Sequence, residues 1–277
     1  MAISSQRFVS QFEPGTFPWP EGKRVAVSLS FDDAHPSQAD AGLSILGRHQ
    51  VRATFYVMPV AVQKNLDAWK RVRDAGHEIG NHTLTHPCSG NFQWSRARAL
   101  EDLTLDQMRT DIAAADVEIH RLLGVRPATF AYPCGQTFVG RGVERRSYTP
   151  VIAEHFVAGR GFRQEVHNDP SYCDLAHVGA FDFDETTFAH FLARLRTAET
   201  ERGWLVLAGH EVSVAGRQSV LAETLDAVCR HCCEPANGIW IETMAAVAAY
   251  ICRVRDNSRS DPPGPPANLS TGTIDPQ

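Results

Sequence analysis

The sequence has little that would place it in or across a membrane. Its apolar runs are short, well below the roughly 20 residues that a spanning helix needs. The first residues, "MAISSQRFVSQFEPGTFPWPEGK", lack the apolar centre of a secretory signal. From these absences we expect a cytoplasmic protein that has no membrane partner.

An excess of positive charge is missing as well. The chain has 27 Lys and Arg against 32 Asp and Glu, which gives a formal net charge of -5. Proteins that bind nucleic acid usually carry a basic face that neutralises phosphates. We therefore expect no nucleic-acid partner, and a small or neutral ligand fits better. The sequence leaves the oligomeric state open.

The cysteines do not suggest a disulfide framework. There are seven, an odd number, and their spacing in a chain of 277 residues does not resemble that of a small secreted protein. The cluster "CRHCC" at 229–233 lies in an amphipathic helical pattern, so we interpret its cysteines as buried helix residues. This pattern agrees with a reducing compartment.

What the sequence does contain is a repeated alternation of strand and helix patterns. The clearest helix covers 105–123, after a capping box of Thr104 and Gln107 and before Gly124. Because parallel strands need crossover connections, the alternation predicts a parallel sheet with helices packed outside it. Other helical patterns begin at Ser37 and cover 67–76 and 219–232. The β-like segments are 24–31, 52–57, 77–82, 128–133, 176–183, 204–210 and 238–243.

The chain length suits one large domain. We expect a single α/β domain at 24–255, preceded by an N-terminal extension at 1–23. Residues 256–277 are rich in Pro, Gly, Ser and Asp and nearly free of large apolar residues, which predicts a disordered tail.

Two aspartates and two histidines follow predicted strands. "SFDDAHP" places Asp32 and Asp33 together, and "NHTLTHP" places His82 and His86 four residues apart. Two imidazoles and one carboxylate form a common ligand set for a divalent cation. A carboxylate that binds a cation is a poor base, so a free neighbour would take the proton from water. The alternatives are a simple turn at the aspartates and a chance pairing among 12 histidines.

Three further stretches carry candidate residues. "WLVLAGHE" offers His210 as an acid for a leaving group, or as a buried histidine at a strand end. The turn in "FAYPCG" exposes backbone N–H groups around Cys134 that can stabilise an oxyanion, and a nucleophilic thiol is the less favoured reading. "SGNFQWSRARALED" carries Phe92, Trp94 and two arginines, which form either a pocket rim that stacks a ring and binds an anion or an ordinary loop.

Taken in order, "SFDD", "NHTLTHP", "FAYPCG" and "LVLAGHE" resemble the successive motifs of the polysaccharide deacetylase superfamily, carbohydrate esterase family 4, also called the NodB homology domain. The resemblance implies a distorted (β/α) barrel of about seven parallel strands. It also implies a hydrolase that removes N- or O-linked acetyl groups from an acetylated amino sugar or polysaccharide, through water bound to a divalent cation, Zn²⁺ or another such as Co²⁺.

The resemblance further implies a role for individual residues. Asp32 is the expected base, His210 the expected acid, and the Cys134 backbone N–H the expected oxyanion donor. The expected metal ligands are Asp33, His82 and His86. Apart from what the resemblance implies, the residues that we expect to contact substrate are Tyr132, Pro133, Phe92 and Trp94.

The sequence departs from the family at two motifs. Ala131 stands where many members have an arginine that pairs with the base, which leaves open what orients Asp32. The family's two acids followed by a tryptophan have no clean match, and we interpret Asp182 and Asp184 in "FDFDE" as surface acids. The alternatives to a glycan deacetylase are an intracellular small-molecule amidase acting on a cyclic amide, imide or ureide, and a carbohydrate-binding protein that has lost the chemistry.

Overall fold

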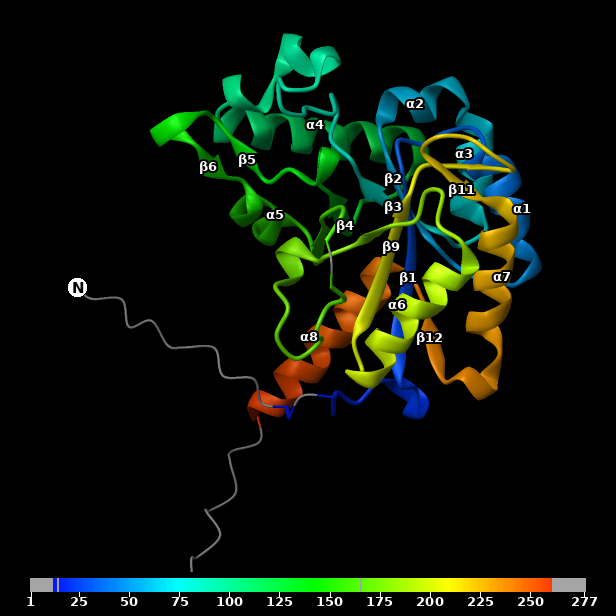
Figure 1. Ribbon diagram of the computed structural model, residues 1–277. Coiled ribbons are helices and arrows are strands. Elements are labelled where there is room, and N and C mark those ends of the chain that lie inside the picture. The colour runs from blue at the N-terminus through cyan, green and yellow to red at the C-terminus, as the bar shows by residue number, and fades with distance from the viewer. Residues whose placement is uncertain (1–11, 14, 165, 261–277) are drawn as a thin grey trace, which may run out of the picture.

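The architecture is a curved parallel sheet wrapped by helices (Figure 1). The computed structural model describes residues 12, 13, 15–164 and 166–260. Seven strands lie side by side, and an eighth, β12, pairs with the first half of β1 while β2 pairs with its second half. In spatial order the strands are β7 (Ala158–Arg160), β4 (Thr129–Ala131), β3 (Glu78–Asn81), β2 (Thr54–Val57), β1 (Val25–Asp32), β9 (Trp204–Gly209) and β8 (Phe181–Asp182), with β12 (Ile239–Ile241) beside β1.

The predicted α/β fold with about seven parallel strands is confirmed, because every pairing in this sheet is parallel. All seven predicted β-like segments contain a strand, although 176–183 contains only the short β8. The prediction missed β7, at the edge of the sheet beside β4.

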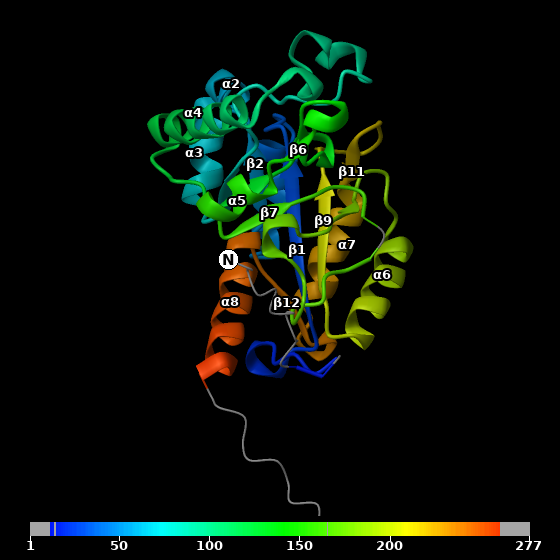
Figure 2. The same ribbon diagram turned by 90° about the vertical axis from the view of Figure 1, so that its left-hand side faces the viewer.

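Helices cover the sheet on both faces, with α8 on the opposite side of β1 from α7 (Figure 2). The helix at 105–123 is confirmed residue for residue as α4, with its capping box at Thr104 and Gly124 in the left-handed region. The segment that begins after Ser37 starts as a single π turn and continues as α1. The helices are α1 (Leu43–Arg48), α2 (Pro59–Lys64), α3 (Leu66–Asp74), α4 (Leu105–Leu123), α5 (Thr149–His155), α6 (Phe188–Thr200), α7 (Ala222–Cys233) and α8 (Met244–Ser260).

Strand alternation separates two cores and points one carboxylate inward. On β1, Val25, Val27 and Leu29 pack with α1, α3 and α7 in one apolar cluster. Ala26 faces the other cluster, which contains Val247 and other residues of α8. Since successive side chains of a strand point to opposite faces, Asp32 at the end of β1 lies on the same face as Ala26.

The two chain ends differ from the predicted boundaries. Phe17 and Trp19, assigned to the N-terminal extension, are buried and pack against Tyr250 of α8. Residues 256–260, assigned to the tail, continue α8, whereas 261–277 lie outside the described residues. Across the described part of the chain, no helix is long and apolar enough to cross a membrane.

Lowering the pH should destabilise the folded state through His77, the residue that precedes β3. Its ring packs edge-on against Phe55, and its Nδ1 accepts a hydrogen bond of 3.1 Å from the Ala53 N–H. Burial, with a smaller effect of Arg52, lowers the pKa of His77 to about 4. A histidine with a lowered pKa stabilises the folded state above the unfolded pKa, and this contribution is lost as the pH falls from 6.5 towards 4.

We therefore expect the free energy of unfolding to fall by about 2 to 3 kcal/mol over that interval through this residue. The measurement is urea unfolding at pH 7.5, 6, 5 and 4 on the wild type and on His77→Asn, whose amide oxygen can still accept from Ala53. The variant should lose less stability over this interval, and two parallel curves would contradict the assignment.

Candidate functional site

The C-terminal ends of six parallel strands meet around one cavity. Such ends are where α/β barrels place their functional groups. The cavity has a volume of about 580 Å³ and lies between the ends of β1 and β9 and the segments that follow β2, β3, β4 and β7. Its lining residues are Asp32, Asp33, Met58, His82, Thr85, His86, Phe92, Trp94, Cys134, Phe162, Arg163, His210 and Gln218.

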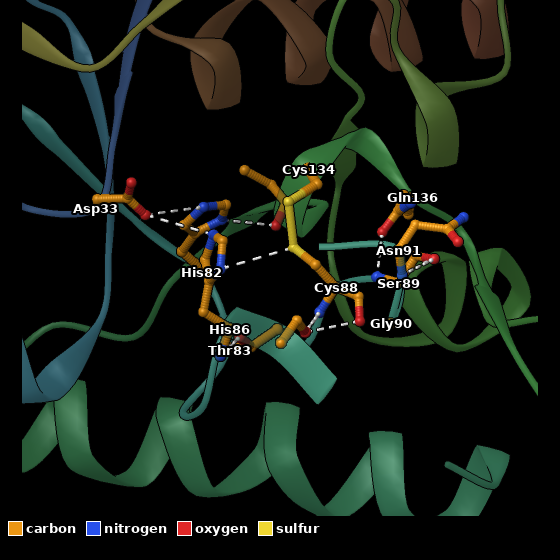
Figure 3. Close-up of a disulfide and its surroundings, with 12 residues drawn as sticks. Asp33, His82, Thr83, His86, Cys88, Ser89, Gly90, Asn91, Cys134 and Gln136 are labelled. Carbon is orange, nitrogen blue, oxygen red and sulfur yellow. Dashed lines mark hydrogen bonds and ion pairs between the residues drawn. A yellow bond between two sulfur atoms is a disulfide. The ribbon is translucent and has the colours of Figure 1, made fainter. Parts of the chain in front are cut away.

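Asp33, His82 and His86 converge on one point (Figure 3). Asp33 Oδ1 lies 3.5 Å from His82 Nε2 and 3.4 Å from His86 Nε2. This oxygen is buried and has no hydrogen-bond partner among the described residues. A buried carboxylate oxygen without a partner is costly unless a cation occupies the space beside it. The three residues therefore fit a divalent cation of the kind bound by two imidazoles and a carboxylate.

Adjacent aspartates reach different targets because the chain turns between them. Asp32 is the last residue of β1, whereas Asp33 has a φ of 72°, in the left-handed region. Burial acts to raise the pKa of Asp33, but the nearby imidazole of His35 and the charges of His82 and His86 outweigh it and leave the pKa well below its ordinary value. Asp33 is thus ionised and suited to hold a cation.

Each histidine presents the same ring nitrogen, Nε2, to Asp33. His82 is 1% exposed, and its Nδ1 lies 2.9 Å from the Ala131 carbonyl oxygen. A carbonyl can only accept, so Nδ1 carries the proton and Nε2 is left with its lone pair. Burial and the neighbouring His82 lower the pKa of His86 to about 4, which keeps its imidazole neutral.

The loop from β3 to His86 is held by polar contacts and is not helical. Asp111 of α4 accepts hydrogen bonds from the Leu84 N–H at 2.9 Å and from the Thr85 hydroxyl at 2.6 Å. The Thr83 hydroxyl accepts from the His86 N–H at 2.9 Å. The spacing of four between the histidines therefore reflects a curled loop fixed by a buried acid of α4.

Arg160 pairs with Asp32, and the sequence did not reveal it. Asp32 Oδ1 accepts a charge-assisted hydrogen bond from Arg160 Nη2, and both side chains are buried. Arg160 ends β7, and its register partner on the adjacent β4 is Ala131. The guanidinium missing at Ala131 is therefore supplied by the next strand. The only signal in the sequence is the short run "AGRG", which has too few β-branched residues to predict a strand.

His210 pairs with Asp184, so the interpretation of Asp184 as a surface acid is wrong. The Asp184 side chain is 7% exposed, and its Oδ2 lies 2.6 Å from His210 Nδ1. Its Oδ1 accepts from the His210 backbone N–H at 2.9 Å. Burial acts to lower the pKa of His210. The side-chain hydrogen bond to Asp184 and the charge of Asp32 outweigh burial and raise this pKa to about 9. His210 is therefore protonated at neutral pH.

The turn after β4 places Cys134, but not its two predicted neighbours, at the cavity. Cys134 has a φ of 54° and lines the cavity, and no carbonyl of the described residues accepts from its N–H. Tyr132 is fully buried, and its hydroxyl donates to the Ala176 carbonyl at 2.6 Å. Pro133 is buried as well and does not line the cavity. Burial contradicts the expected contact of these two side chains with substrate.

Cys88 and Cys134 form a disulfide, so the expectation that the cysteines lack disulfides is wrong for this pair. The remaining five cysteines are free. Cys229 and Cys232 are buried in α7 as predicted, whereas Cys233, the third cysteine of that cluster, is exposed and contradicts the prediction. Disulfides persist mainly in oxidising compartments, so the cysteines no longer support the cytoplasmic location, which stays a prediction.

Two exposed aromatic rings form one wall of the cavity. Phe92 is 43% exposed and Trp94 is 63% exposed, and their rings stack with centroids 5.5 Å apart. The Trp94 ring lies 5.9 Å from the His86 ring. On the other side, Phe162, which sequence reasoning missed, contacts His210 edge-on at 5.6 Å. The cavity therefore combines polar groups at its base with aromatic surfaces at its rim.

Comparison with known proteins agrees with this arrangement. Residues 20–141 match the family model described as polysaccharide deacetylase. The peptidoglycan-N-acetylglucosamine deacetylase of Bacillus cereus is 30% identical over 114 residues, which are 41% of this chain and 38% of that protein. The chain thus matches well under half of this relative's length.

Two solved structures share the fold. A Mycobacterium smegmatis protein assigned to the polysaccharide deacetylases superposes with a TM-score of 0.65 at 17% identity, over 87% of this chain and 93% of that one. A family 4 acetyl xylan esterase from Clostridium thermocellum, in complex with a cobalt ion, gives a TM-score of 0.53 at 21% identity, over 81% and 91%. The fold is thus the α/β half-barrel of these two structures. Within it, residues 20–141 resemble the polysaccharide deacetylase family.

Proposed function

We propose that the protein is a divalent-metal-dependent hydrolase that removes acetyl groups from an acetylated amino sugar or glycan. The observation that carries the proposal is the convergence of three groups on one cavity: the Asp33, His82 and His86 set, the Asp32–Arg160 pair and the His210–Asp184 pair. The proposed ion is zinc, with cobalt as a substitute, since the family 4 esterase structure holds cobalt.

Each group has a distinct task in the proposed reaction. A divalent cation held by Asp33, His82 and His86 would polarise the acyl carbonyl and lower the pKa of a water molecule. Asp32, held by Arg160, accepts the proton of the attacking water. His210, protonated at neutral pH, gives a proton to the departing amine or alcohol.

The developing oxyanion needs a donor, and we assign this role to the Cys134 N–H. It belongs to a residue that lines the cavity and makes no hydrogen bond to a carbonyl of the described residues. One such donor contributes about 2.7 to 4 kcal/mol in hydrolases where it has been removed.

The rim suits a sugar ring. Phe92 and Trp94 offer stacked aromatic faces next to His86, and the cavity volume of about 580 Å³ lies in the usual range for small-ligand sites. These two rings would offer an aromatic platform in a chain whose sequence has no clean match to the family motif that carries the pocket tryptophan. The resemblance to peptidoglycan deacetylases favours an acetylated glucosamine unit over a cyclic amide.

The test is a substrate panel. Purified protein loaded with zinc should release acetate from acetylated chito-oligosaccharides or acetylated xylan and leave cyclic imides unchanged. The control is the same protein with His86→Ala, which should release none. Turnover of cyclic imides alone would replace the proposal with the amidase alternative, and binding without turnover would favour a protein that has lost the chemistry.

The pH profile should report the His210–Asp184 pair. Since Asp184 and Asp32 raise the pKa of His210 to about 9, the acid form is lost only as the pH rises through that value. We expect kcat/KM to decline on the alkaline side near this pH, and Asp184→Asn to move the decline towards lower pH. Asp182→Asn, two residues away and paired with Arg163, is the matched control. If the alkaline decline of kcat/KM stayed at the same pH in Asp184→Asn, the assignment of His210 as the acid would be refuted.

A further inference from the structure

The Cys88–Cys134 disulfide lies beside His82 and His86, on the side away from Asp33 (Figure 3). It joins the loop that follows His86 to the turn that carries the proposed oxyanion donor. We propose that this disulfide is a positioning element of the catalytic site, and that its reduction by a dithiol weakens metal binding and slows turnover. The expected loss of turnover rests on the proposed function, whereas the expected loss of metal affinity can be measured without a substrate.

The first contact is with the His86 ring. Cys88 Sγ lies 3.8 Å from His86 Nδ1, while Nε2 of the same ring faces Asp33. Ligand histidines are usually oriented by a group that contacts the ring nitrogen not facing the metal. For His82 that group is the Ala131 carbonyl. At His86 the corresponding position, next to Nδ1, is occupied by Cys88 Sγ. The disulfide therefore holds the His86 ring on the side that faces away from Asp33.

The second contact is with the oxyanion turn. Cys134 is a residue with a side chain in the left-handed region, a conformation that costs about 1 to 2 kcal/mol relative to the right-handed one. The bond to Cys88 fixes the side chain of Cys134 and so restrains the direction of its N–H. Once the bond is broken, the turn can relax towards a backbone conformation that aims the N–H elsewhere.

The backbone at Cys88 is anchored independently of the disulfide. The Cys88 N–H donates to the Ser95 hydroxyl at 3.0 Å, and the Cys88 carbonyl accepts from the Leu100 N–H at 3.1 Å. The neighbouring Ser89 N–H donates to the Gln136 side chain at 2.7 Å. Loss of the S–S bond should therefore leave the loop folded. Its effect should concentrate on the His86 ring and the Cys134 turn.

The cavity gives a reductant its approach. Cys134 is partly exposed and lines the cavity, whereas Cys88 is fully buried. One thiolate of a dithiol attacks Cys134 Sγ, the S–S bond breaks, and Cys88 leaves as a thiolate that takes up a proton. The second thiol of the reductant then closes on the first, which releases Cys134 as a thiol. The protein gains two electrons and two protons, and the dithiol becomes a cyclic disulfide.

The experiment compares wild type, Cys88→Ala/Cys134→Ala and the matched control Cys252→Ala, whose cysteine is free and lies on α8. Zinc affinity is measured by competition with a chromophoric chelator. The values of kcat and KM are measured on an acetylated chito-oligosaccharide, and Tm is measured by thermal melting. We expect the double variant to bind zinc at least about tenfold more weakly, in line with removal of a group that orients a ligand histidine, and to lose mainly kcat. Cys252→Ala should match the wild type.

Reversible reduction of the wild type keeps the inference testable if the double variant fails to fold. Dithiothreitol in a zinc-buffered solution should lower zinc affinity and turnover, oxidised glutathione should restore both, and a saturating substrate should slow the loss. The double variant should not respond to dithiothreitol, which separates bond cleavage from metal stripping by the reagent.

Two outcomes would overturn the inference. One is a double variant with a lower Tm but unchanged zinc affinity and kcat, which would make the disulfide a structural staple only. The other is reduction of the wild type, verified by thiol counting, with no change in zinc affinity. If the oxidised wild type releases no acetate from any glycan, the proposed function fails, but the zinc affinities still decide this inference.

Discussion

Replacing Asp32 by asparagine should lower kcat by about 100- to 10,000-fold while the protein keeps its metal, because general-base catalysis contributes on that order. Asp32 is buried on the inner face of the sheet and is paired with Arg160, whereas the carboxylate aimed at His82 and His86 belongs to Asp33. An amide keeps the size of the side chain but cannot accept the proton. The effect should therefore fall on kcat and leave zinc content at the wild-type level.

The measurement pairs elemental analysis with initial rates on one acetylated oligosaccharide. Asp40→Asn, a change of the same kind at an exposed position of the π turn that follows β1, is the control. Asp33→Asn should give the opposite pattern, with the metal lost first. Full activity of Asp32→Asn would refute its role as the base.

Removing the guanidinium of Arg160 should be nearly as damaging. Arg160→Met leaves Asp32 buried without its partner, and a charge uncovered in this way destabilises a fold by about 3 to 5 kcal/mol. It also frees the base to turn, and a displacement of about 1 Å in a catalytic group lowers rates by about 100-fold. We expect loss of kcat, a lower Tm and retained zinc. Arg160→Lys should recover part of the rate, since a cation returns to the site.

The adjacent strand offers a sharper test of the same residue. Ala131 and Arg160 are register partners on β4 and β7, so Ala131→Arg in an Arg160→Ala background returns the guanidinium from the neighbouring strand. Recovery of kcat in the double variant, relative to Arg160→Ala alone, would show that the charge beside Asp32 matters more than its strand of origin. If Arg160→Met kept the wild-type kcat and pH profile, Arg160 would have only a structural role.

The parts of the fold and site that sequence predicts are those governed by local pattern. The helix at 105–123 is encoded by its apolar period, its capping box and its terminal glycine, all within 21 residues of one another. Asp33, His82 and His86 follow strands with strong apolar runs, and parallel strands bring such ends together. The three side chains converge on one point, and their role as metal ligands stays a proposal.

The parts that sequence misses depend on distant partners. Arg160 is 128 positions from Asp32, and it ends a three-residue strand that local preference does not indicate. In the sequence Asp184 resembles a surface acid, but in the structure it is hydrogen-bonded to His210, which is 26 positions later in the chain. Cys88 and Cys134 are 46 positions apart, and a count of seven cysteines does not say which two meet. In each case tertiary contact, and not local pattern, decides the role.

The central claim is tested most directly by metal reconstitution. Protein stripped by a chelator is titrated with zinc, or with cobalt in a parallel series, while acetate release from an acetylated chito-oligosaccharide is measured at each point. The account predicts no turnover without metal and a rate that rises in proportion to metal until one ion is bound per chain, with His82→Ala and His86→Ala inactive throughout. Undiminished turnover in the stripped protein, or full activity in His86→Ala, would contradict it.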